Sequence, residues 1–310
     1  MKSDITNLAA SVNQRLLNLR NSRKEDFQVI LNRFGLERFL YRISQSPFAA
    51  QLILKGAFSF ELLGADLYRP TRDADFLGFF KPSEEEIRRV FTLICRQKVE
   101  PDGLVFNPES VAAAAIREQN IISGIRIRLT ASLQNIRLRL QFDVAIGELK
   151  KPKPEIAEFP TILPFPAPRI LIYPKELTIA DKFHAICKLG MLNSRVKDYF
   201  DIYRFSRCFP FTGNSLKNQI KIIFEREKSI ISAETPDALT DSFGQIPEKR
   251  ILWKRFLNRI GKESFDLTLE QTIDCVRQFI LPPAVSAAEK KRFELYWPPG
   301  GPWRPREKKR

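Results

Sequence analysis

The sequence predicts an α+β protein in which a lobe with a mixed sheet precedes a helical C-terminal lobe. Apolar and polar residues alternate over 124–133 and again over 136–146, which is typical of a β-hairpin with one buried face. Seven prolines then fall between Pro152 and Pro174 and interrupt regular structure. Beyond them, apolar residues recur at helical spacing, which predicts the second lobe.

The first 45 residues predict two N-terminal helices. Leu8, Val12 and Leu16 lie four residues apart and form one apolar stripe. Ser22 is the expected N-cap of the second helix, because its hydroxyl can accept a hydrogen bond from a free N–H in the first turn.

Residues 46–150 predict the α/β lobe. An apolar run over 51–54 predicts a buried strand, and Gly56 permits a tight turn into a helix. A second strand is expected over 73–79. Ser83 caps the next helix, whose first turn is rich in glutamate.

The proline-rich segment 151–175 is expected to be an extended surface connector with one short strand at 169–172. Residues 176–310 form the predicted helical lobe, which ends in the basic tail 308–310. Its helices are expected at 176–191, 195–208, 213–227, 248–261 and 268–281.

Charge and composition limit the class of protein. Lys and Arg outnumber Asp and Glu by 51 to 36, a net charge of +15, which favours an anionic partner such as nucleic acid. The longest uncharged run, 43–54, is too short for a membrane span. Four scattered cysteines predict a reducing, cytoplasmic location, and one histidine, His184, excludes a His-rich zinc site.

Two carboxylates share one face of the second predicted strand. Asp73 and Asp75 are two residues apart, so their side chains leave the same side of the backbone. Oxygen ligands of this kind suit Mg²⁺, and Asp143, on the polar face of the hairpin, can supply a third carboxylate. The alternative is structural: Asp73 caps a turn and Asp75 pairs with Arg72 or Arg69.

The turn at Lys55-Gly56 precedes a helix and therefore offers backbone N–H groups to a phosphate. It is no Walker A loop, since GxxxxGK[ST] does not occur in the sequence. The simpler interpretation is that Gly56 only makes a turn.

A third charged cluster lies in the helical lobe. Asp198 and Asp201 are three residues apart on one helix, and Lys182 lies one helix earlier. Lys182 can reach a triphosphate, while either aspartate can orient it or act as a general base. The alternative is an interhelical salt-bridge cluster.

Four blocks together resemble the AbiEii/AbiGii toxin family of nucleotidyltransferases, which have a polymerase-β-like fold. The resemblance extends over nearly the whole chain, and its blocks are Leu54-Lys55-Gly56-Ala57, 69–75, Asp181-Lys182-Phe183 and 195–201. The family pattern implies that Asp73, Asp75 and Asp143 bind Mg²⁺ or Mn²⁺.

The same resemblance implies that Lys55, Gly56, Ala57, Arg72 and Lys182 contact the nucleoside triphosphate. Asp198 and Asp201 match the acidic positions of the last motif. The expected activity is nucleotide transfer to RNA, at the tRNA acceptor end, by a toxin whose antitoxin is a separate repressor that forms no tight complex. No membrane association is expected.

One departure from the family pattern keeps two alternatives open. Many members place Gly-Ser or Gly-Gly-Thr where this chain has Gly56-Ala57-Phe58, and the nearest hydroxyl, that of Ser59, follows one or two positions later. The chain is therefore also compatible with transfer to a protein or small-molecule hydroxyl. It is further compatible with an inactive relative that binds nucleic acid or a partner protein.

Overall fold

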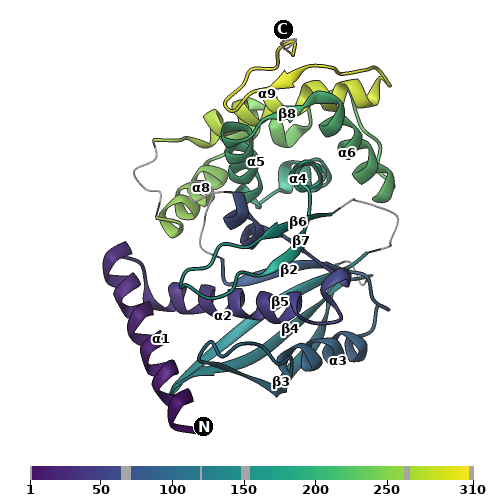
Figure 1. The fold of residues 1–310 in the computed structure, drawn as a ribbon. Helices are drawn as coiled ribbons and strands as arrows, with labels where there is room; N and C mark the ends of the chain where they lie inside the picture. The colour runs from purple at the N-terminus through teal and green to yellow at the C-terminus, as the bar shows by residue number, and fades with distance from the viewer. Residues whose placement is uncertain (1, 64–70, 119–120, 148–153, 262–265, 307–310) are drawn as a thin grey trace. The chain divides into compact units, whose positions relative to one another are not determined.

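The computed structural model describes residues 2–63, 71–118, 121–147, 154–261 and 266–306. The chain divides into two compact units, Met1–Tyr173 and Pro174–Arg310. Figure 1 shows the sheet in the first unit and the helices of the second. Each unit is described by itself below. The predicted α+β class, with a mixed sheet and a helical C-terminal region, is confirmed.

Unit 1 is built on a seven-stranded sheet with the order β3-β4-β5-β2-β1-β7-β6. Strand β2 runs parallel to β5, and β1 runs parallel to β7, whereas the other neighbours are antiparallel. The strands are β1 (Leu52–Lys55), β2 (Asp73–Gly78), β3 (Leu104–Glu118), β4 (Ile121–Leu133), β5 (Ile136–Ile146), β6 (Glu155–Glu158) and β7 (Arg169–Ile172).

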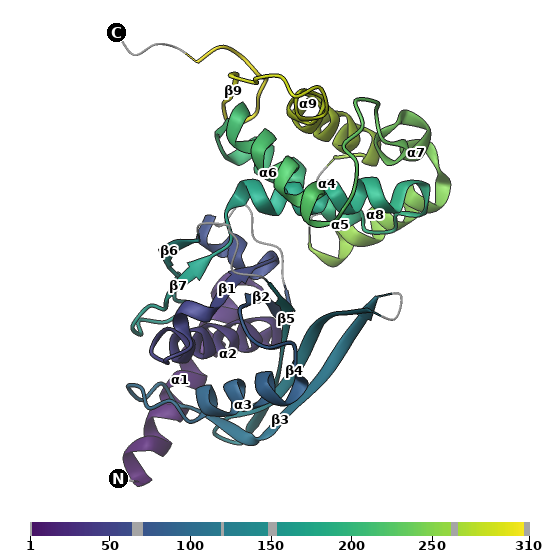
Figure 2. The same ribbon diagram turned by 90° about the vertical axis from the view of Figure 1, so that its right-hand side faces the viewer.

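Three α-helices and two 3-10 helices complete the described part of unit 1. They are α1 (Lys2–Arg23), α2 (Phe27–Ser44), α3 (Glu84–Cys95), η1 (Ala49–Gln51) and η2 (Ala57–Leu63). Figure 2 shows α2 and α3 on the same side of the sheet. Among the residues that the structure describes, Figure 2 shows no helix of this unit on the opposite face of β3, β4 and β5.

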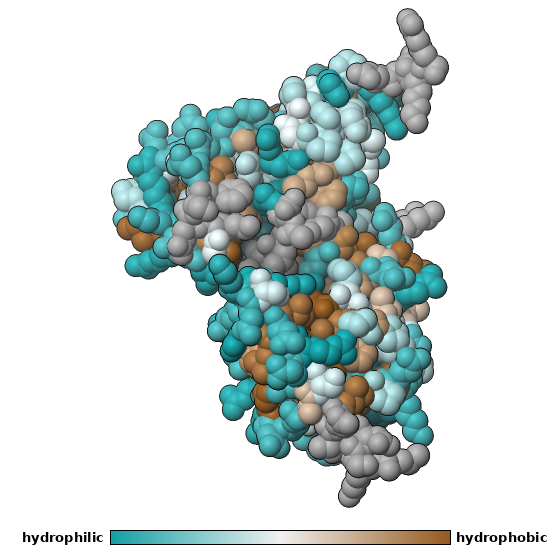
Figure 3. All heavy atoms as spheres, turned by 60° about the vertical axis from the view of Figure 1, so that its left-hand side comes forward, coloured by the Kyte–Doolittle hydropathy of each residue, from teal (hydrophilic) through white to brown (hydrophobic). Residues whose placement is uncertain are grey.

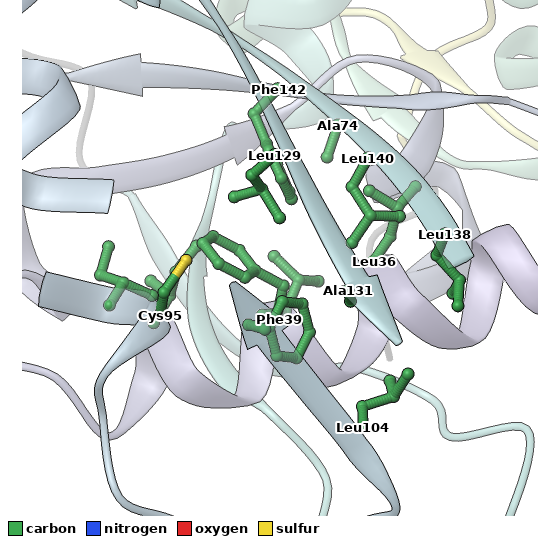
Figure 4. Packing of buried hydrophobic residues seen from close by; sticks show 14 of the residues in the cluster. Leu36, Phe39, Ala74, Cys95, Leu104, Leu129, Ala131, Leu138, Leu140 and Phe142 are labelled. Carbon is green, nitrogen blue, oxygen red and sulfur yellow. The ribbon is translucent and has the colours of Figure 1, made fainter. Parts of the chain in front are cut away.

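The core of unit 1 lies between the sheet and these helices. Phe39 of α2 stacks near Phe91 of α3, and its ring centre lies 4.5 Å from that of Phe142 on β5. In Figure 4, Phe39 and Cys95 point toward leucines and alanines from the central strands. The even-numbered residues 138–144 of β5 are buried in this core, and Ile136 and Ile146 at the ends of the strand pack against it, as the alternation predicts.

A buried ionic network crosses the same unit. Arg42 binds Asp102 through two hydrogen bonds of 2.7 and 3.1 Å, and Arg38 lies 3.5 Å from the same carboxylate. Glu37, which is fully buried, accepts a hydrogen bond from the Ile162 N–H at 2.8 Å. Burial raises the pKa of Glu37 to about 7, against the opposing effects of that hydrogen bond and of Arg38.

Unit 2 is largely helical. Its α-helices are α4 (Lys175–Leu189), α5 (Val196–Cys208), α6 (Gly213–Arg226), α7 (Asp241–Gln245), α8 (Pro247–Arg259) and α9 (Leu269–Ala288). Two short strands far apart in the sequence, β8 (Phe211–Thr212) and β9 (Tyr296–Trp297), pair antiparallel in a separate two-stranded sheet. The ring of Trp303 stacks on Phe279, which fixes the irregular C-terminal segment to α9.

Several sequence expectations about local structure need correction. Asp26, not Ser22, caps α2, because its side chain accepts from two N–H groups of the first turn. Helix α9 runs through Pro282 and Pro283, past the expected end at residue 281. The predicted basic tail, 308–310, lies outside the described residues.

Segment 151–175 contains more sheet than expected. The predicted strand at 169–172 is present as β7 and pairs with β1, and β6 adds an unpredicted edge strand. The edge strand β3 was also not predicted, since Pro108 and the alanine run 112–115 are poor strand formers.

Candidate active site

Asp73 and Asp75 begin strand β2 and point to the face opposite the core. The residues between and after them, Ala74 and Phe76, are buried, whereas both aspartates are half-buried. The period of two in a strand thus places the two carboxylates on the same side, as predicted.

Strand register extends this pair into a row of charges. Lys55 pairs with Asp75, Asp75 with Asp143, and Asp143 with Arg126 of β4. Directly opposed residues share a face of the sheet, and neighbouring strands lie about 4.8 Å apart. The sheet therefore brings Lys55, Asp75 and Asp143 into one row, with Asp73 beside it.

Gly56 lies directly against Asp75. Its φ of +70° is in the left-handed region that favours glycine. A Cβ at this position would overlap Oδ2 of Asp75 and lie 2.8 Å from its Cγ. Only a glycine leaves room for the carboxylate over the turn, so the candidate phosphate turn and the candidate metal ligand are in contact.

Arg126 holds Asp143. Its Nε and Nη2 donate to the two carboxylate oxygens at 2.8 and 2.6 Å. This hydrogen bonding raises the pKa of Arg126, and the charges of Asp143, Asp73 and Asp75 add to the effect. Sequence reasoning missed Arg126, although the alternation of β4 and β5 could have placed it opposite Asp143.

The residues at which this chain departs from the family pattern, Gly56-Ala57-Phe58, lie in a packed turn. Ala57 and Phe58 are buried, and the Phe58 ring lies 4.7 Å from that of Phe159. Ser59 is also buried, and its hydroxyl donates to the Gly56 carbonyl at 2.7 Å. The hydroxyl of Ser59 is therefore used within the turn.

Asp73 is oriented by a neighbouring hydroxyl. Thr71 Oγ1 donates to Asp73 Oδ1 at 2.8 Å, which fixes one oxygen of this carboxylate. Arg72 is exposed, as a phosphate contact would need to be. Arg69, the other cation expected in this loop, lies outside the described residues.

In unit 2, Lys182 is held between two aspartates. Its ammonium lies 2.8 Å from Asp198 Oδ1 and 2.7 Å from Asp201 Oδ2. Arg195 Nε lies 2.8 Å from the other oxygen of Asp198. The side chains of both aspartates are almost fully buried, at 0% and 2% exposed. The arrangement orients Lys182 and also ties α4 to α5.

His184 packs inside unit 2. Its Nε2 lies 2.9 Å from Ser229 Oγ, and its ring meets Phe224 edge-on. Burial lowers the pKa of His184. These contacts make His184 a packed residue in the interior of unit 2.

Two features are absent from the residues that the structure describes. No group of three or more His, Cys, Asp or Glu side chains there could hold a metal ion. No helix there is long and apolar enough to cross a membrane. Figure 3 shows mainly hydrophilic residues on one face of the molecule, with smaller apolar patches between them.

Comparison with known proteins identifies the class. Residues 38–283 match a family model of nucleotidyl transferases. That model describes the AbiEii toxins of type IV toxin–antitoxin systems, so the chain belongs to the AbiEii nucleotidyltransferase toxin family. The family expected from the four sequence blocks is confirmed. The chain is accordingly a nucleotidyltransferase with a nucleoside triphosphate substrate and an antitoxin partner.

Two solved structures from Helicobacter pylori are similar to the chain. One, assigned as a nucleotidyltransferase, shares 16% identity with a TM-score of 0.42, over 84% of this chain and 95% of that one. The other, JHP933, shares 16% identity with a TM-score of 0.44, over 84% and 92% of the two chains. A comparison with curated proteins gives no match.

Proposed function

We propose that this toxin transfers a nucleoside monophosphate from a nucleoside triphosphate to an RNA hydroxyl, at the acceptor end of tRNA, and so blocks translation in the cytoplasm. The observation that carries the proposal is the contact between Gly56 and Asp75. It joins a turn suited to phosphate with two carboxylates suited to a cation, and nucleotidyl transfer needs both at one place.

The reaction forms one bond and breaks another. The RNA hydroxyl oxygen bonds to the α-phosphorus, the bond from that phosphorus to the β-phosphate oxygen breaks, and pyrophosphate leaves with its electron pair. The hydroxyl proton passes to solvent water as the new bond forms. Such a transfer depends on positioning and charge neutralisation more than on covalent chemistry by the protein.

Asp73 and Asp75 would hold Mg²⁺ or Mn²⁺. Their oxygen donors fit a hard cation, which commonly takes one or two carboxylates and completes its shell with substrate phosphates. When bound, the cation would neutralise phosphate charge and lower the pKa of the attacking hydroxyl. Thr71 orients Asp73 for this role. Asp143 is the third candidate ligand, but the described side chains form no three-carboxylate cluster, so Asp143 would first have to release Arg126, which binds both of its oxygens.

Other residues would bind the triphosphate. Lys55 and the exposed Arg72 supply positive charge, and the backbone at Gly56-Ala57 supplies N–H donors. Lys182 is a further candidate phosphate contact. Asp198 and Asp201 would hold its ammonium in place, since both bind it in unit 2.

The net charge of +15 supports an RNA acceptor, because phosphate contacts by Lys and Arg dominate nucleic-acid affinity. We further propose that the antitoxin acts as a separate repressor and forms no tight complex with the toxin. Copurification of the two proteins in a stable complex would contradict this second point.

Transfer of label tests the main proposal. Purified protein is incubated with total RNA, Mg²⁺ and each α-labelled triphosphate in turn, beside the Asp73→Asn/Asp75→Asn double variant. The exposed Asp237→Asn is the matched control for loss of a carboxylate. We expect label in a tRNA-sized band with wild type and the control but not with the double variant.

Other results would point elsewhere. A labelled product that resists ribonuclease indicates a protein or small-molecule acceptor. No label with any of the four triphosphates indicates an inactive relative. Undiminished transfer by the double variant would show that Asp73 and Asp75 are not the catalytic carboxylates.

A further inference from the structure

The helix-free face of the sheet in unit 1 carries four arginines in adjacent rows. Arg126 and Arg128 lie two residues apart on β4, and Arg137 and Arg139 lie two residues apart on β5. All four alternate with buried residues, so all four leave the sheet on the side away from the core. This set of four is called the arginine face below.

Register places the arginine face next to the candidate active site. Arg126 is in the row of Asp143 and Asp75, and Arg128 is in the next row, opposite Gln141. Arg139 and Arg137 follow in the third and fourth rows. Six residues of strand separate Asp143 from Arg137, so the face extends about 20 Å from the carboxylates.

Few carboxylates neutralise the charges of the arginine face. No Asp or Glu occurs between Glu118 and Asp143 in the sequence. Arg126 is neutralised by Asp143, and Arg128 lies 3.4 Å from the neutral side chain of Gln141. Arg137 and Arg139 are exposed, and neither forms an ion pair with any other residue that the structure describes. The two arginines farthest from the candidate active site, Arg137 and Arg139, are therefore the ones whose charge no described carboxylate neutralises.

The surroundings of the arginines are small and flat. Ala114 pairs with Arg126 and Ala112 with Arg128 across β3. Thr130 and Ser132 pair with Arg139 and Arg137. Short side chains beside long ones leave the guanidinium groups accessible over an open sheet surface.

We propose that the arginine face binds the sugar–phosphate backbone of the RNA acceptor and directs its end toward Asp75. This inference rests on the proposed function and adds to it the surface that holds the acceptor. Guanidinium groups bind phosphate oxygens through paired hydrogen bonds and also stack on bases, which suits a strand running across the rows.

An acidic protein is the less suitable occupant. Stable protein interfaces need buried aromatic or aliphatic anchors at their centre, and the positions beside these arginines hold alanine, threonine and serine. Val105, in the row of Ser132 and Arg137, is exposed on the outermost strand β3 and is the aliphatic residue at the edge of this face. A face made mainly of charge and small side chains, with its aliphatic residue at the edge and not at the centre, favours a polyanionic backbone.

The test compares two double variants. Arg137→Gln/Arg139→Gln removes two charges from the arginine face, at positions outside the candidate catalytic machinery. Arg88→Gln/Arg96→Gln removes two exposed charges from α3 and its C-cap, where Arg96 pairs with the exposed Glu109; α3 covers the opposite side of the sheet. Binding of fluorescent tRNA is measured by anisotropy at several salt concentrations, in the Asp73→Asn/Asp75→Asn background so that no turnover occurs.

We expect the arginine-face variant to bind tRNA about tenfold more weakly at low salt. Its log–log salt slope should fall in magnitude by about 1.4 to 1.8, the value for two lost phosphate contacts. In the active background, the KM for RNA should rise while the KM for the triphosphate stays unchanged. The α3 variant should keep the affinity and salt slope of its parent.

Equal tRNA affinity and salt slope for both variants would overturn the proposal. So would a loss of labelling on a protein acceptor with tRNA binding intact, since the arginine face would then serve a protein. The proposed function fails by a different result, the absence of any labelled RNA with wild-type protein. The two failures can therefore be told apart.

Discussion

Arg126 donates to both carboxylate oxygens of Asp143, whereas Asp75, its neighbour across β2 and β5, lies against the Gly56 turn. The two aspartates share a row of the sheet, and the guanidinium of Arg126 already neutralises Asp143.

This difference predicts how the protein responds to divalent ions. Any cation that uses Asp143 must compete with the guanidinium of Arg126. We expect Arg126→Gln to lower the dissociation constant for Mg²⁺ or Mn²⁺, measured by titration calorimetry without RNA. Arg126→Lys, which keeps the charge, is the control and should stay near wild type. Equal affinities for all three proteins would indicate that Asp143 takes no part in cation binding.

The contact of Gly56 with Asp75 predicts a sensitive position. Gly56→Ala adds backbone strain of about 1 to 2 kcal/mol, because its φ is positive, and also forces the Asp75 carboxylate to move. Gly261→Ala is a matched control, since Gly261 has a similar φ of +65° but open space around it.

Both glycine variants should unfold at lower urea concentration, but only Gly56→Ala should lose nucleotide transfer. Transfer at the wild-type rate by folded Gly56→Ala protein would show that the position of Asp75 does not limit the reaction.

The ion pairs of Lys182 with two buried aspartates predict that loss of this lysine destabilises unit 2. Replacing Lys182 by alanine leaves the carboxylates of Asp198 and Asp201 buried without their shared cation, which costs about 3 to 5 kcal/mol. Lys221→Ala on the surface of α6 should change the free energy of unfolding by less than about 0.5 kcal/mol.

Urea denaturation measures both variants. If Lys182→Ala is as stable as wild type but transfers no nucleotide, the lysine acts on the substrate and its buried pairs contribute little to stability.

Glu37 predicts a pH dependence of stability. Its pKa is about 7 in the folded protein and 4.5 in the unfolded chain, so the folded state retains a proton between these values. Stability must therefore fall as pH rises from about 5 to about 8, by up to about 3 kcal/mol from this residue.

Glu61, whose burial also raises its pKa to about 7, contributes in the same direction. Glu37→Gln should reduce the decline to about half, and Glu248→Gln, on the exposed side of α8, should leave it unchanged. Urea midpoints at pH 5.5 and 8 give the measurement. If the stability of Glu37→Gln falls between pH 5.5 and 8 as much as that of wild type, the pH dependence belongs to other titratable groups.

The fold was predicted best where local pattern and tertiary burial agree. The strict alternation of residues 136–146 gave β5 without error, and the helix starting at Val196 was placed within one residue. Strand β3 was missed because its alanines have no β preference of their own and gain order only by pairing with β4.

The candidate site was predictable only in its local parts. Spacing alone put Asp73 and Asp75 on one face, whereas the link between Asp143 and Arg126 follows only when the short turn between Leu133 and Ile136 is used to set the register of β4 on β5. The close contact between Gly56 and Asp75 likewise depends on the pairing of β1 with β2.

The alternation on β5 also protects the folding of the sheet. A slip of one residue in its pairing with β4 would turn Arg137, Arg139 and Asp143 into the apolar core and expose Leu138, Leu140 and Phe142. Burying three charges in this way costs far more free energy than keeping them on the polar side of the sheet. The residues proposed to hold RNA therefore double as a barrier against misregistered and aggregating forms of the long hairpin.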